Sequence, residues 1–199
     1  MGNMKKKLAQ NKSAVGLITL SILIIGLFFG NAYLNSKSGG SSNQQTGTPS
    51  QQSKFAYLST HGNSSCSNDF LTSISTMNDN ERLQGSCCSP MALSKYVEQV
   101  DNLKKYSSIS VIPADPYDIP AKLAKQLFVY DKTITPTASE QKVLDAAVAA
   151  SPEKGYCCCK CWRWYTYEGL SKYLVHAKHF SAKQITDVLA NSDGCGGAS

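Results

Sequence analysis

Apolar residues recur every three or four positions in several separate segments of this chain, which is the spacing of an amphipathic helix. In residues 89–106 the apolar positions on one helical face are Leu93, Tyr96, Val97, Val100 and Leu103. Ser89 is a typical N-cap residue, and Pro90 suits the first helical position. The segment is therefore predicted to be a helix that begins at Ser89.

Other segments carry similar start signals. A helix is expected near residues 68–77, and another is expected to begin near Cys157 and to continue through Leu174. The remaining predicted helix starts are Asp118 with Pro120, the capping box Thr137 with Glu140, and Ser181 with Gln184. No run shows the two-residue alternation of a half-buried strand followed by hairpin residues. The pattern predicts an all-α fold, a small cysteine-rich helical domain behind an N-terminal transmembrane helix.

The N-terminal region has a different pattern. Residues 1–12 contain four lysines and no acidic residue, and an uncharged apolar segment at 13–34 follows, long enough to cross a bilayer as a helix. Because positive residues stay on the cytoplasmic side, this arrangement predicts a cytoplasmic N-terminus and a single-pass anchor that places the rest of the chain outside the cytoplasm. Gly30-Asn31-Ala32 also fits a signal-peptide cleavage site, in which case the protein is secreted.

Residues 35–53 are rich in Ser, Gly, Gln, Asn and Thr and are expected to form a flexible linker. The folded extracytoplasmic domain is then predicted to cover residues 54–199. Of the twenty Lys and Arg residues, four precede the anchor, so sixteen basic and fourteen acidic residues remain outside it. This near balance argues against a nucleic-acid partner.

The chemistry of the chain lies in its cysteines. All eight fall in the predicted extracytoplasmic domain: Cys66, Cys87, Cys88, Cys157, Cys158, Cys159, Cys161 and Cys195. An even number of cysteines in an oxidising compartment is first interpreted as a set of disulfides. Adjacent cysteines bridge each other only with strain, so the runs at 87–88 and 157–159 would each need distant partners.

The spacing at 157–161 favours a metal site instead. On an ideal helix that turns about 100° per residue, Cys157 and Cys161 lie within about 40° of each other, and Cys158 lies about 60° from Cys161. Three thiolates on one side suit a soft ion such as copper, zinc or mercury. Cys157, Cys158 and Cys161 are the predicted core ligands. Further ligands are expected from Cys87, Cys88 and Cys195, and a structural role from Cys66 and Cys159.

A redox role is the enzymatic alternative. Cys158-Cys159-Lys160-Cys161 has the C-x-x-C spacing, and the start of a helix together with Lys160 and Arg163 would favour thiolates. Cys158 and Cys161 would then be the attacking and resolving pair of a thiol–disulfide oxidoreductase. However, the strand that precedes this motif in thioredoxin-like folds is not predicted here, so the pattern favours a binding protein over an enzyme. His176 and His179 are interpreted as exposed polar residues rather than ligands.

Several motifs also carry a resemblance to other proteins. "LQGSCCSPM", "DPYDIPAKLAK", "EKGYCCCKCWRWY", "EGLSKYL" and "SDGCGG" resemble segments of a small group of exported or membrane-anchored prokaryotic proteins of uncharacterised function. The resemblance covers about residues 66–197 and implies export without implying an activity. The chain is more distantly similar to exported proteins with a Pro-Cys-Tyr-Cys-Gly-Cys motif, although it lacks the proline and the glycine of that motif.

The sequence therefore predicts a membrane-tethered extracytoplasmic protein that binds a thiophilic metal ion through clustered cysteines. A disulfide-stabilised interaction domain and a thiol–disulfide oxidoreductase are the alternatives.

Overall fold

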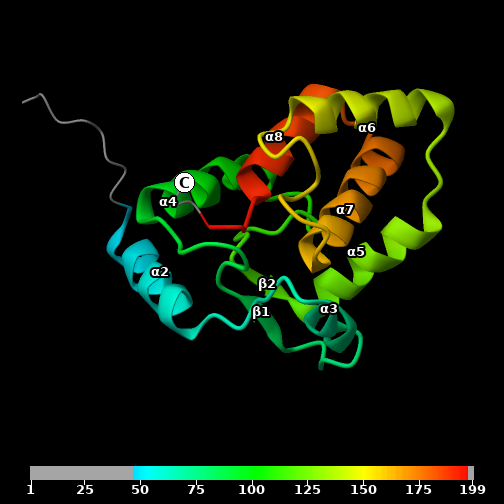
Figure 1. The fold of residues 1–199 in the computed structure, drawn as a ribbon. Coiled ribbons are helices and arrows are strands. Elements are labelled where there is room, and N and C mark those ends of the chain that lie inside the picture. Colours follow the sequence, from blue (N-terminus) through cyan, green and yellow to red (C-terminus); the bar gives the residue numbers. More distant parts are fainter. Residues whose placement is uncertain (1–46, 197–199) are drawn as a thin grey trace, which may run out of the picture. The chain divides into compact units, whose positions relative to one another are not determined.

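The structure is a computed structural model that describes residues 47–196. The predicted anchor at 13–34 lies outside the described residues. Within residues 47–196, no helix combines the length and the apolar composition that a bilayer crossing requires. The described helices are α2 Pro49–His61, α3 Asn68–Ile74, α4 Leu93–Leu103, the 3₁₀ turn η1 Lys104–Tyr106, α5 Ala121–Thr133, α6 Ala138–Ala150, α7 Trp162–Lys178 and α8 Ala182–Ser192 (Figure 1). The described part is therefore mainly helical, as predicted.

One small sheet was not predicted. Strand β1 (Arg82–Gln84) pairs antiparallel with β2 (Asp118–Pro120), with Leu83 opposite Ile119. Each strand has only three residues, which is too short for an alternating pattern to stand out in the sequence. Leu83 and Ile119 are both fully buried, so the pair joins the hydrophobic core and fixes where the loop after β1 leaves the sheet.

The helix caps explain which boundaries the sequence predicted correctly. Thr137 with Glu140 and Ser181 with Gln184 form the two predicted capping boxes, and they begin α6 and α8. The folded chain, in contrast, begins earlier than the predicted boundary at residue 54. A third capping box at Thr48 starts α2 at Pro49, so the last residues of the predicted linker are helical.

Two predicted helix starts are wrong for a common reason, which is that the expected cap residue has another partner. The Ser89 amide and hydroxyl both donate to the Cys195 carbonyl, at 2.9 and 3.0 Å, and α4 begins only at Leu93. The Asp118 carboxylate forms ion pairs with Lys54 and Arg82, and α5 begins at Ala121 after Pro120. Tertiary contacts therefore override these local capping signals.

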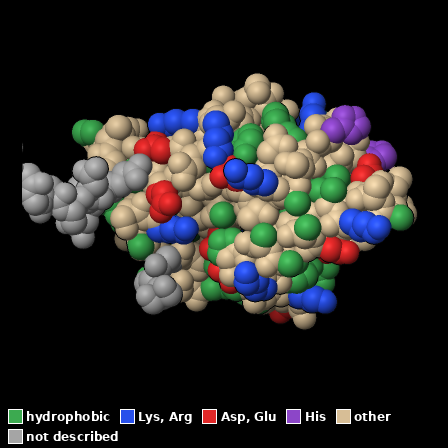
Figure 2. Space-filling view, turned by 90° about the horizontal axis from the view of Figure 1, so that it is seen from above, with side chains coloured by type: hydrophobic (Ala, Val, Ile, Leu, Met, Phe, Trp, Pro, Cys, Tyr) green, Lys and Arg blue, Asp and Glu red, His purple; other side chains and the backbone are tan. Residues whose placement is uncertain are grey.

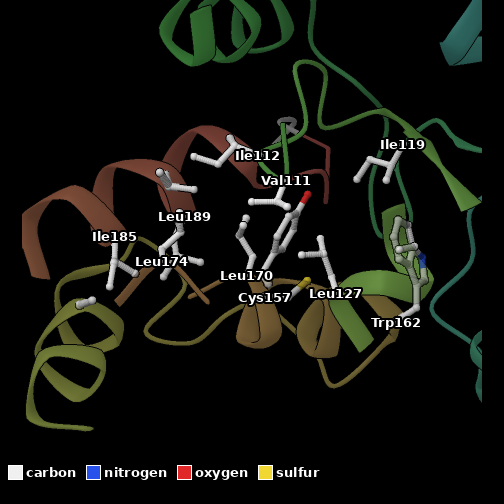
Figure 3. Close-up of a cluster of buried hydrophobic side chains, with 14 of the residues drawn as sticks. Val111, Ile112, Ile119, Leu127, Cys157, Trp162, Leu170, Leu174, Ile185 and Leu189 are labelled. Atoms are coloured by element: carbon white, nitrogen blue, oxygen red, sulfur yellow. The ribbon is translucent and has the colours of Figure 1, made fainter. Parts of the chain in front are cut away.

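The core is built around α7, which contacts α3, α5, α6 and α8. Leu170 and Leu174 of α7 pack with side chains of the other elements, including Leu127, Ile185 and Leu189 (Figure 3). Figure 3 also places the Cys157 side chain in this apolar cluster. A smaller cluster of Leu58, Tyr96, Val97 and Tyr117 joins α2 to α4. The loops that carry Cys157, Cys161 and Cys195 are thus anchored in the main hydrophobic core.

The contact between α5 and α7 requires a glycine. A β-carbon added at Gly169 would overlap the Leu127 carbonyl oxygen and would lie 2.8 Å from the Asp131 amide nitrogen. Because both atoms belong to backbone, neither can move aside without shifting α5. The close approach of these helices sets the position of α7, whose N-terminus adjoins the cysteines.

We expect Gly169→Ala to lower the free energy of unfolding by about 2 kcal/mol, since a forced contact in a packed interior typically costs this much. In an open helix the same change would stabilise by about 1 kcal/mol, so the sign of the effect is the test. Denaturant unfolding of the metal-free, reduced protein measures it. Lys178→Ala, at the exposed end of α7, is the control and should change stability by less than about 0.5 kcal/mol. A stabilised Gly169→Ala variant would contradict the close packing.

Candidate metal centre

The eight cysteines lie in four loops that are far apart in the sequence. Cys66 lies between α2 and α3, and Cys87 and Cys88 lie between β1 and α4. The run from Cys157 to Cys161 connects α6 to α7, and Cys195 follows α8. All eight are inside the described residues, and none forms a disulfide in the structure.

Backbone contacts hold these loops against one another. The Ser89 amide and hydroxyl bind the Cys195 carbonyl and so join the loop of Cys88 to the segment after α8. The Cys66 sulfur lies 3.1 Å from the Cys87 carbonyl oxygen. In the third loop, the Ser151 hydroxyl bonds to the Gly155 carbonyl at 3.0 Å and accepts from the Gly155 amide at 3.2 Å. The four loops are therefore fixed by contacts that do not use sulfur–sulfur bonds.

The sulfur atoms form one continuous group. The shortest Sγ–Sγ separations are 3.1 Å for Cys66–Cys88, 3.2 Å for Cys88–Cys158, 3.2 Å for Cys158–Cys195 and 3.0 Å for Cys157–Cys195. Longer separations of 3.7, 3.9 and 4.0 Å join Cys87–Cys88, Cys88–Cys159 and Cys157–Cys161. A disulfide has a bond of about 2.05 Å, whereas two thiolates on one tetrahedral zinc ion stand about 3.8 Å apart. These separations lie nearer to those of a shared ion than to a disulfide bond.

The clustered cysteines could hold a metal ion. Four groups of three have all their Sγ atoms within 4.8 Å of one another, and together these groups include all eight cysteines. Cys157, Cys161 and Cys195 are buried, while Cys88 and Cys158 are exposed. The group therefore extends from the hydrophobic core to the surface of the domain.

The predicted ligands are all found in this group. The structure brings Cys157, Cys158 and Cys161 together with Cys87, Cys88 and Cys195, although whether they bind metal remains a prediction. Cys66 and Cys159 were expected to be structural, yet each belongs to two of the four groups of three. Their position depends on the meeting of separate loops, which no local spacing indicates.

The helical geometry used to predict the site is wrong. Residues 157–160 form a loop, and α7 begins at Trp162 with Cys161 as its N-cap residue. Of the thiols in this loop, Cys161 alone takes the cap position at the helix start, where the helix dipole favours negative charge. The thiols of the loop meet because the loop folds against three others, and not because they share a helix face.

Arg163 lies beneath the cysteine group and is completely buried. Its guanidinium donates to the carbonyl oxygens of Pro116 and Gly85, at 2.6 and 3.0 Å, and to the Tyr167 hydroxyl at 3.3 Å. It also lies 4.5 Å from the centre of the Trp162 ring. All three of these hydrogen bonds go to uncharged oxygens, so the positive charge is not neutralised by them.

The groups around Arg163 favour its charged form. Burial disfavours the charged guanidinium, but the neighbouring Tyr167 hydroxyl and the thiols of Cys87, Cys195 and Cys157 raise the pKa of Arg163 above its ordinary value. A buried charge is tolerated when an opposite charge lies close to it. Arg163 therefore matches a site that carries negative charge on sulfur.

The thiols cannot all be ionised at once without a further cation. Hydrogen bonds from Cys157 and Cys87 hold the pKa of the Cys161 thiol far below its ordinary value, while burial raises the pKa of Cys66 and Cys88. The hydrogen bond with Cys157 raises the pKa of Cys195. The Cys161 thiolate thus accepts hydrogen bonds from neighbouring thiols, which keep their own protons. A bound metal cation would allow the other thiols to ionise as well, because metal binding displaces thiol protons.

The histidines named from the sequence lie outside the cysteine groups, whereas the aromatic residues lie beside them. His176 and His179 are exposed, and the His176 ring lies 3.1 Å from the Glu140 carboxylate. Trp162 and Tyr167 are buried beside the group. Trp164 packs edge-on against Tyr156 and lies under the Lys160 ammonium, which is 5.5 Å from the ring centre. These aromatic side chains shield the buried side of the cysteine group from water.

We expect Arg163→Met to lower the free energy of unfolding of the metal-free protein by about 3 kcal/mol, because it leaves the buried carbonyls of Pro116 and Gly85 and the Tyr167 hydroxyl without their donor. Arg163→Lys keeps the charge and should recover part of this loss. Denaturant unfolding under reducing conditions is the measurement. Lys160→Met removes an exposed charge from the adjoining loop and should change stability by less than about 0.5 kcal/mol. Equal stability of Arg163→Met and the parent would exclude a stabilising role for the buried guanidinium.

Comparisons of this chain with family models, with curated proteins and with solved structures find no match. The resemblance drawn from the sequence motifs therefore stays a prediction. The function has to be argued from the geometry of the cysteine group.

Proposed function

We propose that this chain is a membrane-tethered extracytoplasmic protein that binds thiophilic metal ions through its clustered cysteines. The observation that carries the proposal is the continuous group of eight sulfur atoms drawn from four loops, with separations of 3.0 to 4.0 Å along it. Thiolate-only ligand sets select soft ions, among which Cu(I) and Zn²⁺ are the common physiological ones, and mercury binds in the same way.

The pattern of contacts distinguishes this proposal from a disulfide-stapled scaffold. In a stapled scaffold each sulfur has one partner, whereas Cys88 lies close to Cys66 and to Cys158, and Cys158 lies close to Cys88 and to Cys195. Sulfur atoms with several equivalent neighbours suit shared coordination. The buried guanidinium of Arg163 adds to this argument, because a neutral disulfide would not compensate its charge.

The redox alternative has less geometric support. The Cys158 sulfur lies next to those of Cys88 and Cys195, while the Cys161 sulfur lies next to that of Cys157. An attacking and resolving pair must be able to bond directly to each other. The proposed pair Cys158 and Cys161 is therefore not the closest pairing that either sulfur has.

The cellular location is argued from the sequence. Four lysines precede an uncharged apolar segment at 13–34 that is long enough to span a bilayer, and every cysteine follows that segment. A domain held outside the cytoplasm would meet metal ions before the cytoplasmic thiol pools do. The proposed role is thus capture of soft metal ions at the outer side of the membrane.

Metal binding can be tested on the full chain, purified in detergent without oxygen. We expect bound copper or zinc, with most of the eight thiols protected from an alkylating reagent, and we expect a chelator to remove both the metal and the protection. His176→Ala with His179→Ala is the matched control and should leave the metal content unchanged, because the histidines are exposed and lie outside the cysteine groups. A reduced protein that takes up no soft metal would exclude the function.

The location can be tested in cells. We expect the protein to stay with the membrane after an alkaline wash, and a protease added to cells whose outer layers have been made permeable should digest the domain while the cytoplasmic membrane stays intact. A variant that lacks residues 13–34 is the control and should be soluble and resistant to that protease. Resistance of the complete protein would place the domain in the cytoplasm and contradict the proposal.

A further inference from the structure

We infer that the cysteine group is a closed ring of four three-sulfur sites that holds several Cu(I) ions joined by bridging thiolates. This inference rests on the proposed function, metal binding by the cysteines, and specifies the ion and the number of ions. It goes beyond the sequence prediction, which named a thiophilic metal ion and six candidate cysteine ligands.

The first step is the number of sulfur atoms. One zinc or copper ion binds at most four thiolates. A single ion would leave at least four of the eight cysteines without metal, although their sulfur atoms lie 3.0 to 4.0 Å from neighbours within the same group. No break in the group separates a set of ligands from a set of bystanders. The geometry therefore accommodates more than one ion.

The second step is the way in which the groups of three overlap. The four groups are Cys66–Cys159–Cys161, Cys66–Cys87–Cys88, Cys88–Cys158–Cys195 and Cys157–Cys158–Cys159. Each group shares one cysteine with the next, and the fourth shares Cys159 with the first. The shared residues Cys66, Cys88, Cys158 and Cys159 link these four groups in a ring, and the remaining members are Cys161, Cys87, Cys195 and Cys157. The 3.0 Å contact between the Cys157 and Cys195 sulfur atoms joins two of the groups a second time.

This arrangement matches the bonding of metal-bound thiolates. A thiolate sulfur has enough lone pairs to bind two metal ions at once, so the four shared cysteines can act as bridges and the other four as terminal ligands. Four ions in the ring would then each have three sulfur ligands: two bridges and one terminal residue. Every cysteine of the chain is used, with none left over.

The third step is the identity of the ion. Three thiolates and no nitrogen or oxygen ligand form a coordination set that Cu(I) accepts readily, whereas structural zinc sites are completed by a fourth ligand. The groups that contain three or more possible ligands consist of cysteine alone among the described residues. A cubane iron–sulfur cluster would hold its thiolates apart around a core of iron and sulfide, unlike sulfur atoms 3.0 to 4.0 Å from one another. Cu(I) is therefore the ion that fits.

The fourth step is charge. Four Cu(I) ions and eight thiolates carry a net charge of −4, and buried negative charge needs compensation. The Arg163 guanidinium supplies one positive charge, and it lies against Gly85 and Gly194, which are close in the chain to the terminal residues Cys87 and Cys195. The N-terminus of α7 adds a partial positive charge at Cys161, the fourth terminal residue. The positive groups thus lie beside the terminal ligands of the ring.

Loading the ring involves no change of oxidation state when copper is supplied as Cu(I). Each ligand forms a copper–sulfur bond, and each thiol that still holds its proton releases it to solvent, so loading is accompanied by proton release. Two of the bridging residues, Cys88 and Cys158, are exposed, while Cys157, Cys161 and Cys195 are buried. Ions therefore reach the ring from the side of Cys88 and Cys158.

The number of ions is measured by titrating the full, reduced, metal-free chain in detergent with Cu(I) in the presence of a cuprous chelator that competes for it. Saturation at four Cu(I) per chain is expected, and any value from two to four supports a multi-ion site. Saturation at one Cu(I), or uptake of a single zinc ion only, would overturn the ring and leave metal binding intact. Uptake of no metal would instead overturn the proposed function itself.

X-ray absorption of the loaded protein gives a second readout. Bridged ions should show sulfur neighbours only and a short copper–copper separation. Isolated ions on separate sites would show no copper neighbour, and that result would contradict the bridges even at a stoichiometry of four.

Single substitutions test the connectivity. Cys88→Ser removes a bridge that serves two sites, whereas Cys87→Ser, in the same loop, removes a ligand that serves one. We expect the first to lower the stoichiometry by about two ions and the second by about one. Cys158→Ser and Cys157→Ser form an equivalent pair in the other loop, and circular dichroism identifies any variant that fails to fold. Equal losses within both pairs would contradict the shared role of Cys88 and Cys158.

Discussion

The constraint on which the site depends is the burial of one guanidinium that has no carboxylate partner within residues 47–196. Arg163 is reached by the backbone of the β1 loop at Gly85 and by the backbone before β2 at Pro116, and it belongs to the first turn of α7. The β1 loop, the segment before β2 and α7 are therefore joined by the Arg163 guanidinium. A charge in that position is stable when negative charge lies close to it, and the Tyr167 hydroxyl together with the thiols of Cys87, Cys195 and Cys157 raises the pKa of Arg163. The same buried guanidinium therefore both joins three segments of the fold and influences the cysteine thiols.

Much of the helical framework could be predicted from the sequence, because the signals are local. The boxes at Thr137–Glu140 and Ser181–Gln184 satisfy their own helix ends with residues three positions apart, so they form wherever the segment lies. Ser89 and Asp118 have the same local signal, but their side chains bind Cys195 and Arg82, which are distant in the sequence. A capping residue is a dependable guide only when no tertiary partner competes for it.

In the candidate site, too, local sequence signals predict only part of the structure. The run from Cys157 to Cys161 indicated metal chemistry because of its density of thiols, and the structure places these thiols in one group. The reason assumed for their convergence, a shared helix face, is wrong, because these residues form a loop before α7. The parts played by Cys66 and Cys159 depend on contacts between loops up to about a hundred residues apart. Such contacts follow from the packing of the whole core, and no local sequence pattern indicates them.

The contact of Ser89 with the Cys195 carbonyl determines when, during synthesis and folding, the cysteine group can be completed. Cys66 precedes six of the described helices, and Cys195 follows the last of them, so the group draws on nearly the full extent of the domain. A partly synthesised chain lacks the final sulfur and the contact that fixes it. Completion of the domain is therefore needed for the full cysteine group: until the segment after α8 is in place, neither the contact from Ser89 to the Cys195 carbonyl nor the group of Cys88, Cys158 and Cys195 can form.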